Sequence, residues 1–128
     1  MTKQTVSTPK APGAIGPYSQ AVISNGLVYC SGQIALDPET GKVFTGDVAE
    51  QTERVMNNLG AVLEAAGSSF AQAVRCTIYL SDMEYFGRVN EVYGKYFEGT
   101  DPPARATVAV RTLPKHVDVE IDCIAEVG

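Results

Sequence analysis

Two strand-like segments near the C-terminus carry charged residues that stand out against their small and apolar neighbours. In DPPARATVAV, residues 101–110, Arg105 lies in a run of Ala, Thr and Val that is typical of a half-buried strand. Its guanidinium has five donors and a charge that ordinary pH does not remove, so it must face water or meet an anion. The next segment, residues 117–126, carries Glu120, whose carboxylate is a candidate partner for that guanidinium.

The separation of Arg105 and Glu120 depends on how their two strands pair. The strands, at about residues 104–111 and 117–126, are joined by TLPKH, and we predict a hairpin in which Arg111 pairs with His116. In that register Arg105 and Glu120 lie diagonally on one face, about 7 to 8 Å apart, which leaves room for a small anion. A one-residue slip would put them on opposite faces. A cross-strand salt bridge is the alternative interpretation, because exposed ion pairs are common and contribute little. The face shared by both strands is predicted to carry Arg105, Thr107, Ala109, Arg111, Asp118, Glu120, Asp122 and Ile124.

Three further polar residues could belong to a site, each with a simpler explanation beside it. Asn90 is an amide on an otherwise apolar helical stripe, and it needs hydrogen-bond partners if it is buried. Tyr18 follows a Gly-Pro pair at the end of a loop, where its phenol could reach over a neighbouring surface or simply pack. His116 has no companion ligand nearby, so we interpret it as a surface residue. The sequence indicates no metal site.

The elements that must position these residues are predicted from turn signals and apolar periodicity. Asn25-Gly26 is the pair that best fits a type I′ hairpin turn. Apolar residues spaced three and four apart predict a first helix that begins at Asp47 and is followed by Gly67 at its C-terminal end. The predicted order is a short strand near 5–8, a hairpin over 19–31, a helix to residue 66, a strand over 73–80, a helix between 82 and 99, and the two final strands.

This pattern predicts an α/β fold with a five- to six-stranded mixed sheet. Two amphipathic helices can cover only one face of such a sheet, so the other face must be hidden elsewhere. Small and apolar residues are expected on that second face, and a homo-oligomer with sites between subunits would bury them. The residues expected there include Ala104, Ala106, Ala109 and Ile124.

Length and charge narrow the class of protein further. A chain of 128 residues is long enough for a single domain, here residues 1–128, with its own core. The net charge of −5 and the lack of a Lys/Arg cluster argue against nucleic acid as a partner. We interpret Cys30, Cys76 and Cys123 as reduced core residues. The sequence has no apolar signal core and no bilayer-length apolar stretch, so we expect a cytoplasmic protein with no membrane partner.

Six motifs in order along the chain resemble the RidA family, also called YjgF/YER057c/UK114. They are GPYSQAV at 16–22, YCSGQIALDPETG at 29–41, VLEAAGSS at 62–69, VNEVYGKYF at 89–97, PPARATV at 102–108 and LPKHVDVEIDCIA at 113–125. Long motifs that span nearly the whole chain are far more specific than one short pattern. The resemblance implies a chorismate-mutase-like subunit that forms a homotrimer, with three clefts between adjacent subunits.

The resemblance also implies an activity, the hydrolysis of reactive 2-imino acids to 2-keto acids and ammonia without a cofactor. These imines form from 2-aminoacrylate and 2-aminocrotonate. The carboxylate-binding arginine of the family matches Arg105, and its water-handling glutamate matches Glu120. The other cleft residues are matched by Tyr18, Ser31, Gly32, Asn90 and Thr107. Thr107 stands where many relatives have Cys, which leaves only backbone contacts there, and His116 stands where many have Asp.

The residue types suit this chemistry. A guanidinium can hold a carboxylate by two parallel hydrogen bonds, and Glu120 can accept a proton from a water that attacks the C=N carbon. A trimer that binds small carboxylates without turnover is the alternative, although a second anion such as Glu120 would repel a ligand that is only bound. A third idea, ribonuclease activity or translation inhibition, conflicts with the acidic balance of the chain.

Overall fold

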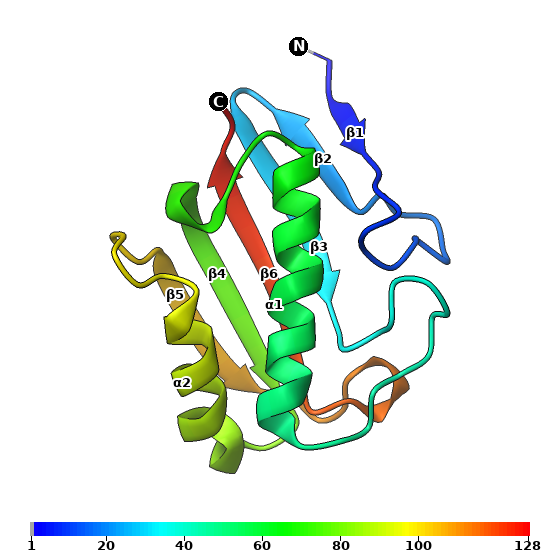
Figure 1. Cartoon of the computed structure of the whole chain (residues 1–128), viewed down its shortest axis with the longest axis vertical. Coiled ribbons are helices and arrows are strands. Elements are labelled where there is room, and N and C mark those ends of the chain that lie inside the picture. Colours follow the sequence, from blue (N-terminus) through cyan, green and yellow to red (C-terminus); the bar gives the residue numbers. More distant parts are fainter. Residues whose placement is uncertain (1) are drawn as a thin grey trace.

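The chain folds into a six-stranded mixed sheet with both α-helices on one face (Figure 1). The computed structural model describes residues 2–128. The strand order across the sheet is β1-β2-β3-β6-β4-β5, and only β4 and β5 run parallel. The α/β class, the six strands and the two covering helices predicted from the sequence are confirmed. The elements are β1 Gln4–Val6, β2 Ala21–Ser24, β3 Leu27–Gln33, α1 Val48–Ala65, β4 Ala73–Leu80, α2 Phe86–Lys95, β5 Ala104–Ala109 and β6 Val119–Glu126, with short 3-10 turns at Phe70–Gln72, Met83–Tyr85 and Pro114–His116.

The β2–β3 hairpin forms because its two turn residues accept backbone conformations that other residues avoid. Asn25 has a φ of 53° and Gly26 a φ of 77°, as a type I′ turn requires. The turn sets the pairing, so Ser24 lies opposite Leu27 and Ala21 opposite Cys30. The predicted hairpin is therefore confirmed, and it brings the start of β3 beside the N-terminal loop.

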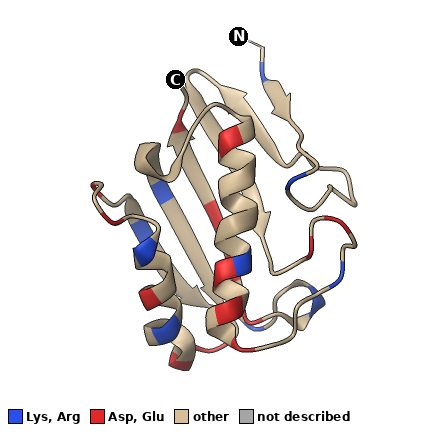
Figure 2. Cartoon of the chain, in the orientation of Figure 1, with Lys and Arg blue, Asp and Glu red and all other residues tan. Residues whose placement is uncertain are grey.

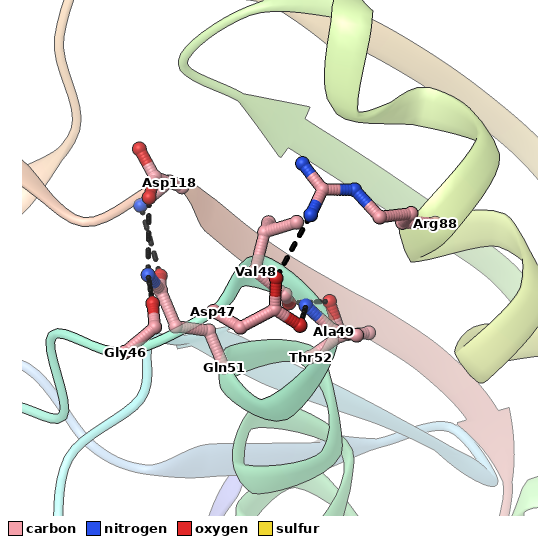
Figure 3. Close-up of polar contacts among 8 residues, drawn as sticks. All are labelled: Gly46, Asp47, Val48, Ala49, Gln51, Thr52, Arg88 and Asp118. Carbon is pink, nitrogen blue, oxygen red and sulfur yellow. Dashed lines mark hydrogen bonds and ion pairs between the residues drawn. The ribbon is translucent and has the colours of Figure 1, made fainter.

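Polar side chains fix the start of α1 to the rest of the molecule (Figure 3). The Asp47 carboxylate accepts a hydrogen bond from the Ala49 N–H at 3.1 Å, which caps the helix, and one from Arg88 on α2 at 2.8 Å. Gln51 exchanges two hydrogen bonds of 3.0 Å with Asp118, just before β6. These contacts hold α1, α2 and the β6 entrance together at one end of the sheet.

The core lies between the two helices and the face of the sheet that they cover. Alternate residues of β6, and of β4 from Cys76 onward, are buried in it, whereas Val74 is 40% exposed at an irregularity of the β4–β6 pairing. The largest fully buried side chains are Met56, Leu59, Leu63, Ile78, Leu80 and Ile121.

No helix within residues 2–128 is long and apolar enough to cross a membrane.

The predicted hairpin between the last two strands is wrong. β5 is an edge strand that pairs with β4 in parallel, and β6 lies on the other side of β4, between β4 and β3 (Figure 1). Two parallel strands must be joined by a crossover connection, and α2 supplies that connection between β4 and β5. The connection from β5 to β6 then passes over the end of β4, where Val110 N–H bonds to Leu80 O and Ser81 N–H to Asp118 O.

The corrected topology changes which residues share a face. Arg105 lies opposite Cys76 and Ala109 opposite Leu80, both buried under the helices, so these β5 residues belong to the helix-covered face. Ala109 is therefore not on the uncovered face, contrary to expectation. Glu120 lies opposite Tyr79 on the uncovered face. That face also exposes apolar side chains, since Tyr29 and Val108 are each 43% exposed.

Candidate functional site

Arg105 lies against α2 and forms the first half of the candidate site. Its guanidinium donates a hydrogen bond of 2.5 Å to the Asn90 Oδ1 atom. Its Cζ atom lies 5.2 Å from the ring centroid of Tyr93 and 5.6 Å from that of Phe86. An open hollow of about 490 Å³ adjoins these groups and is lined by Asn90, Tyr93, Gly94, Phe97, Pro102, Pro103 and Arg105.

The amide oxygen of Asn90 accepts a hydrogen bond from Arg105, outside the core. The sequence placed it on an apolar stripe, but its side chain is exposed and only Val89, Val92 and Tyr93 of α2 are buried. The structure thus brings two of the predicted site residues, Asn90 and Arg105, into direct contact.

Glu120 lies in a second cavity, of about 480 Å³, together with three other predicted site residues. The cavity is open to solvent, and its lining is mostly apolar apart from Tyr18, Ser31, Gln33, Lys115 and Glu120. A Cβ atom on Gly32 would collide with the Glu120 carboxylate, so the glycine allows that carboxylate to lie against the β3 backbone. The cavity is lined by Pro12, Gly13, Ile15, Tyr18, Ser31, Gly32, Gln33, Ile34, Leu36, Pro114, Lys115 and Glu120.

A buried glutamine holds the loop that forms one wall of this cavity. The Gln20 side chain donates to Pro12 O at 2.8 Å and to Thr8 O at 3.1 Å, and it accepts from the Thr8 N–H at 2.7 Å. The Ser31 hydroxyl donates to Ser19 O at 2.6 Å, which ties β3 to the same loop. The sequence analysis missed Gln20. A long polar side chain before the apolar strand AVIS, beside a loop rich in Pro and Gly, was the available signal.

The electrostatic environment of Glu120 favours its protonated form. Partial burial raises the pKa of its carboxyl above the ordinary value, and the negative charge of Asp122 raises it further. Asp122 is held in place because it accepts hydrogen bonds from the Tyr79 hydroxyl at 3.0 Å and the Thr77 N–H at 3.2 Å. A carboxylate with a raised pKa is a stronger base than an ordinary glutamate, which suits a role as a proton acceptor.

Arg105 and Glu120 do not meet within one chain. They lie on opposite faces of the sheet, with β4 between their strands, so the predicted diagonal arrangement is wrong. The alternative interpretation, a cross-strand salt bridge between them, is wrong for the same reason. The one ion pair found within residues 2–128 joins Arg88 to Asp47. Within one chain, Arg105 and Glu120 therefore line two separate hollows.

The chain is similar in sequence to known proteins over nearly its whole length. The sequence matches the family described as Endoribonuclease L-PSP over residues 8–127. It is 44% identical over 128 residues to the human 2-iminobutanoate/2-iminopropanoate deaminase, covering 100% of this chain and 93% of that protein.

The chain belongs to the RidA/YjgF family. It is also 56% identical over 127 residues to protein DfrA of Myxococcus xanthus, with 98% of this chain and 96% of that protein covered. Among solved structures it resembles Escherichia coli TdcF with bound serine, at a TM-score of 0.93 and 38% identity, covering 98% of this chain and 99% of that one. The resemblance recognised in the sequence motifs is confirmed.

Two predicted positions of this RidA/YjgF chain lie away from both hollows. Thr107 lies opposite Ile78 on the helix-covered face, and its buried hydroxyl has no hydrogen-bond partner among residues 2–128. His116 is exposed, as expected, but it lies in the connection that passes over β4 and not in a hairpin turn. It follows Lys115, and both residues have a positive φ, of 56° and 55°.

The three cysteines of this RidA/YjgF protein are buried side by side in the sheet. Cys30 lies opposite Cys123, and Cys123 opposite Cys76, on three adjacent strands. Burial raises the pKa of Cys30 to about 12, so its thiol stays protonated at neutral pH. Within residues 2–128, no three His, Cys, Asp or Glu side chains come together as a metal-binding group.

Proposed function

We propose that this protein hydrolyses reactive 2-imino acids, such as those formed from 2-aminoacrylate and 2-aminocrotonate, to 2-keto acids and ammonia. Two observations on the matched residues carry the proposal: Arg105 has no carboxylate partner within residues 2–128, and Glu120 is partly buried with a raised pKa. The first suits the carboxylate of the substrate, and the second suits a base that activates water. The names of the human, mouse and rat relatives support the same reaction.

We infer further that one complete site takes Arg105 from one copy of the chain and Glu120 from another. Within one chain the two residues lie on opposite faces of the sheet. The exposed apolar side chains on the uncovered face support burial against further copies. We propose a homotrimer with three such sites, in keeping with the family resemblance.

In the proposed reaction Arg105 binds the substrate carboxylate by two parallel hydrogen bonds and so fixes the C=N carbon in space. With the imine in its protonated form, C=NH₂⁺, a water attacks that carbon as Glu120 accepts a proton from the water, which gives a carbon bearing both OH and NH₂. Glu120 returns its proton to the nitrogen, so the C–N bond breaks and ammonia leaves, and the hydroxyl loses its proton to solvent as the C=O bond forms. The sum is one imino acid and one water converted to one keto acid and one ammonia. Tyr18, Ser31, Gly32 and Asn90 are proposed to line the site, with Thr107 contributing at most backbone contacts.

A carboxylate-binding role without turnover is the second candidate. The bound serine in the related TdcF structure favours it, because serine also carries a carboxylate. Glu120 argues for turnover, since a site that only binds anions gains nothing from a second carboxylate. The description of the family as an endoribonuclease does not suit the charge of this chain. Figure 2 shows Lys and Arg interspersed with Asp and Glu along both helices and not gathered in one stripe, and the net charge is −5.

The test is the release of ammonia and keto acid from 2-aminoacrylate generated in situ, with and without the protein. We expect the protein to accelerate release, and the Glu120→Gln variant to lose most of that acceleration while it still binds 2-oxobutanoate. Binding without acceleration by the parent protein would instead support the carboxylate-binding role. If the parent protein shows no binding and no acceleration, both the hydrolytic role and the carboxylate-binding role are refuted.

A further inference from the structure

We propose that Phe86 and Tyr93 are positioning residues that hold the Arg105 guanidinium in the orientation that receives the substrate carboxylate. This inference rests on the proposed function of Arg105. It concerns two aromatic side chains of α2 that also pack in or against the core.

The two rings and Asn90 form one stripe of α2 that faces Arg105. Residues 86, 90 and 93 are spaced four and three apart, so they lie on the same side of the helix. The ring centroids of Phe86 and Tyr93 lie 5.6 and 5.2 Å from Arg105 Cζ, within the range in which a cation is attracted to an aromatic ring. Asn90 accepts a hydrogen bond from the same guanidinium. Three contacts from one rigid helix therefore converge on one side chain of an edge strand.

Aromatic rings can hold a guanidinium without using its donors. A carboxylate partner would bind the N–H groups and cancel the charge, whereas a ring attracts the cation and accepts none of its in-plane N–H groups. Within residues 2–128, the Arg105 side chain makes a single hydrogen bond, the one to Asn90. The remaining donors of its five N–H groups are left for a ligand. The cost of ordering a long side chain on binding is reduced, because the side chain is already held.

The ring of Tyr93, and not its hydroxyl, is the part that acts on Arg105. The side chain is 5% exposed, and its hydroxyl lies beside the Cys76 thiol without a hydrogen bond of ordinary geometry to any of residues 2–128. The hydroxyl of Tyr96, just past α2, by contrast donates to Asn57 at 3.1 Å. Removal of the Tyr93 hydroxyl should therefore leave the contact with Arg105 intact.

The experiment compares leucine and aromatic substitutions at both positions by KM, kcat and melting temperature. We expect Phe86→Leu and Tyr93→Leu each to raise KM for the imino acid about fivefold with kcat close to the parent value. Phe86→Tyr and Tyr93→Phe should restore KM to within about twofold of the parent, because each keeps a ring. The matched control is Tyr85→Leu, which removes the ring 5.5 Å from Arg88 instead, and it should leave KM unchanged.

A second readout does not depend on turnover. The NMR signal of the Arg105 Nε–H proton should be shifted by the two rings in the parent and should move toward the random-coil position in Phe86→Leu. If the parent lacks imine hydrolysis, the proposed function fails, while this signal still reports on the contact. A parental KM or an unmoved Arg105 signal in Phe86→Leu would overturn the inference. So would a loss of kcat that follows a lower melting temperature and is not rescued by Phe86→Tyr.

Discussion

Replacement of Arg105 by lysine separates the carboxylate-binding role from a general need for positive charge. In the structure the guanidinium gives one N–H to Asn90 and keeps the others free, including a flat pair that can hold both oxygens of a carboxylate. Lysine keeps the charge but has no such planar pair. We expect the loss of one charge-assisted hydrogen bond and of the orientation it imposes, about 2 to 3 kcal/mol, or about 30- to 150-fold in kcat/KM.

The assay for Arg105→Lys is imine hydrolysis measured beside thermal unfolding. Arg105 is exposed and makes no ion pair among residues 2–128, so the melting temperature should stay close to that of the parent. Arg88→Lys is the matched control, since Arg88 also lies over a ring and pairs with Asp47, but away from both hollows. We expect it to leave kcat/KM unchanged. Near-parental kcat/KM in Arg105→Lys would refute the two-bond role of the guanidinium.

Three further predictions follow from the Glu120 cavity and the cysteines. Because burial and Asp122 raise the pKa of Glu120, kcat/KM should fall with decreasing pH at a higher pH than an ordinary glutamate would give, and Asp122→Asn should move that fall to lower pH by removing a repelling charge. A pH profile that stays in place or moves upward in Asp122→Asn would contradict this explanation. Gly32→Ala should lower kcat/KM at least about tenfold by displacing the Glu120 carboxylate. The free energy of unfolding should change by no more than about 1 kcal/mol, because the flexible Glu120 side chain can move aside. Parental kinetics would show that the position of the carboxylate is not critical. Neither EDTA nor iodoacetamide should reduce turnover, because the proposed steps use no metal and no thiol, and all three cysteines are buried, with the pKa of Cys30 raised to about 12. A loss of activity with either reagent would count against the mechanism.

Local signals explain why much of the fold could be predicted from the sequence. The turn pair Asn25-Gly26 fixes the β2–β3 hairpin through its two positive φ angles. Asp47 caps α1, and Gly67, with a φ of 78°, ends it, so the helix bounds fall within one residue of the expected ones. Each of these features depends on residues that are close together in the chain.

The relation between Arg105 and Glu120 could not be predicted in the same way, because it depends on strand pairing between distant segments. TLPKH was interpreted as a hairpin turn, whereas the chain there passes over β4 and returns on its far side. β6 alternates buried and half-buried residues, which fits a central strand, whereas no residue of β5 is fully buried, which fits an edge strand. A helix, α2, also lies between β4 and β5 in the sequence, and such a helix is the usual crossover connection of parallel strands.

Because Arg105 and Glu120 lie on opposite faces of the sheet within one chain, the sharing of a site between copies is the central claim. The most direct test mixes two variants, Arg105→Ala and Glu120→Gln, after joint unfolding and refolding, and measures imine hydrolysis. If each site takes Arg105 from one copy and Glu120 from another, random mixing leaves about a quarter of the sites with both native residues, so about a quarter of parental activity should return. Each variant refolded alone should stay near its own low activity. A mixture no more active than the two variants alone would contradict the account.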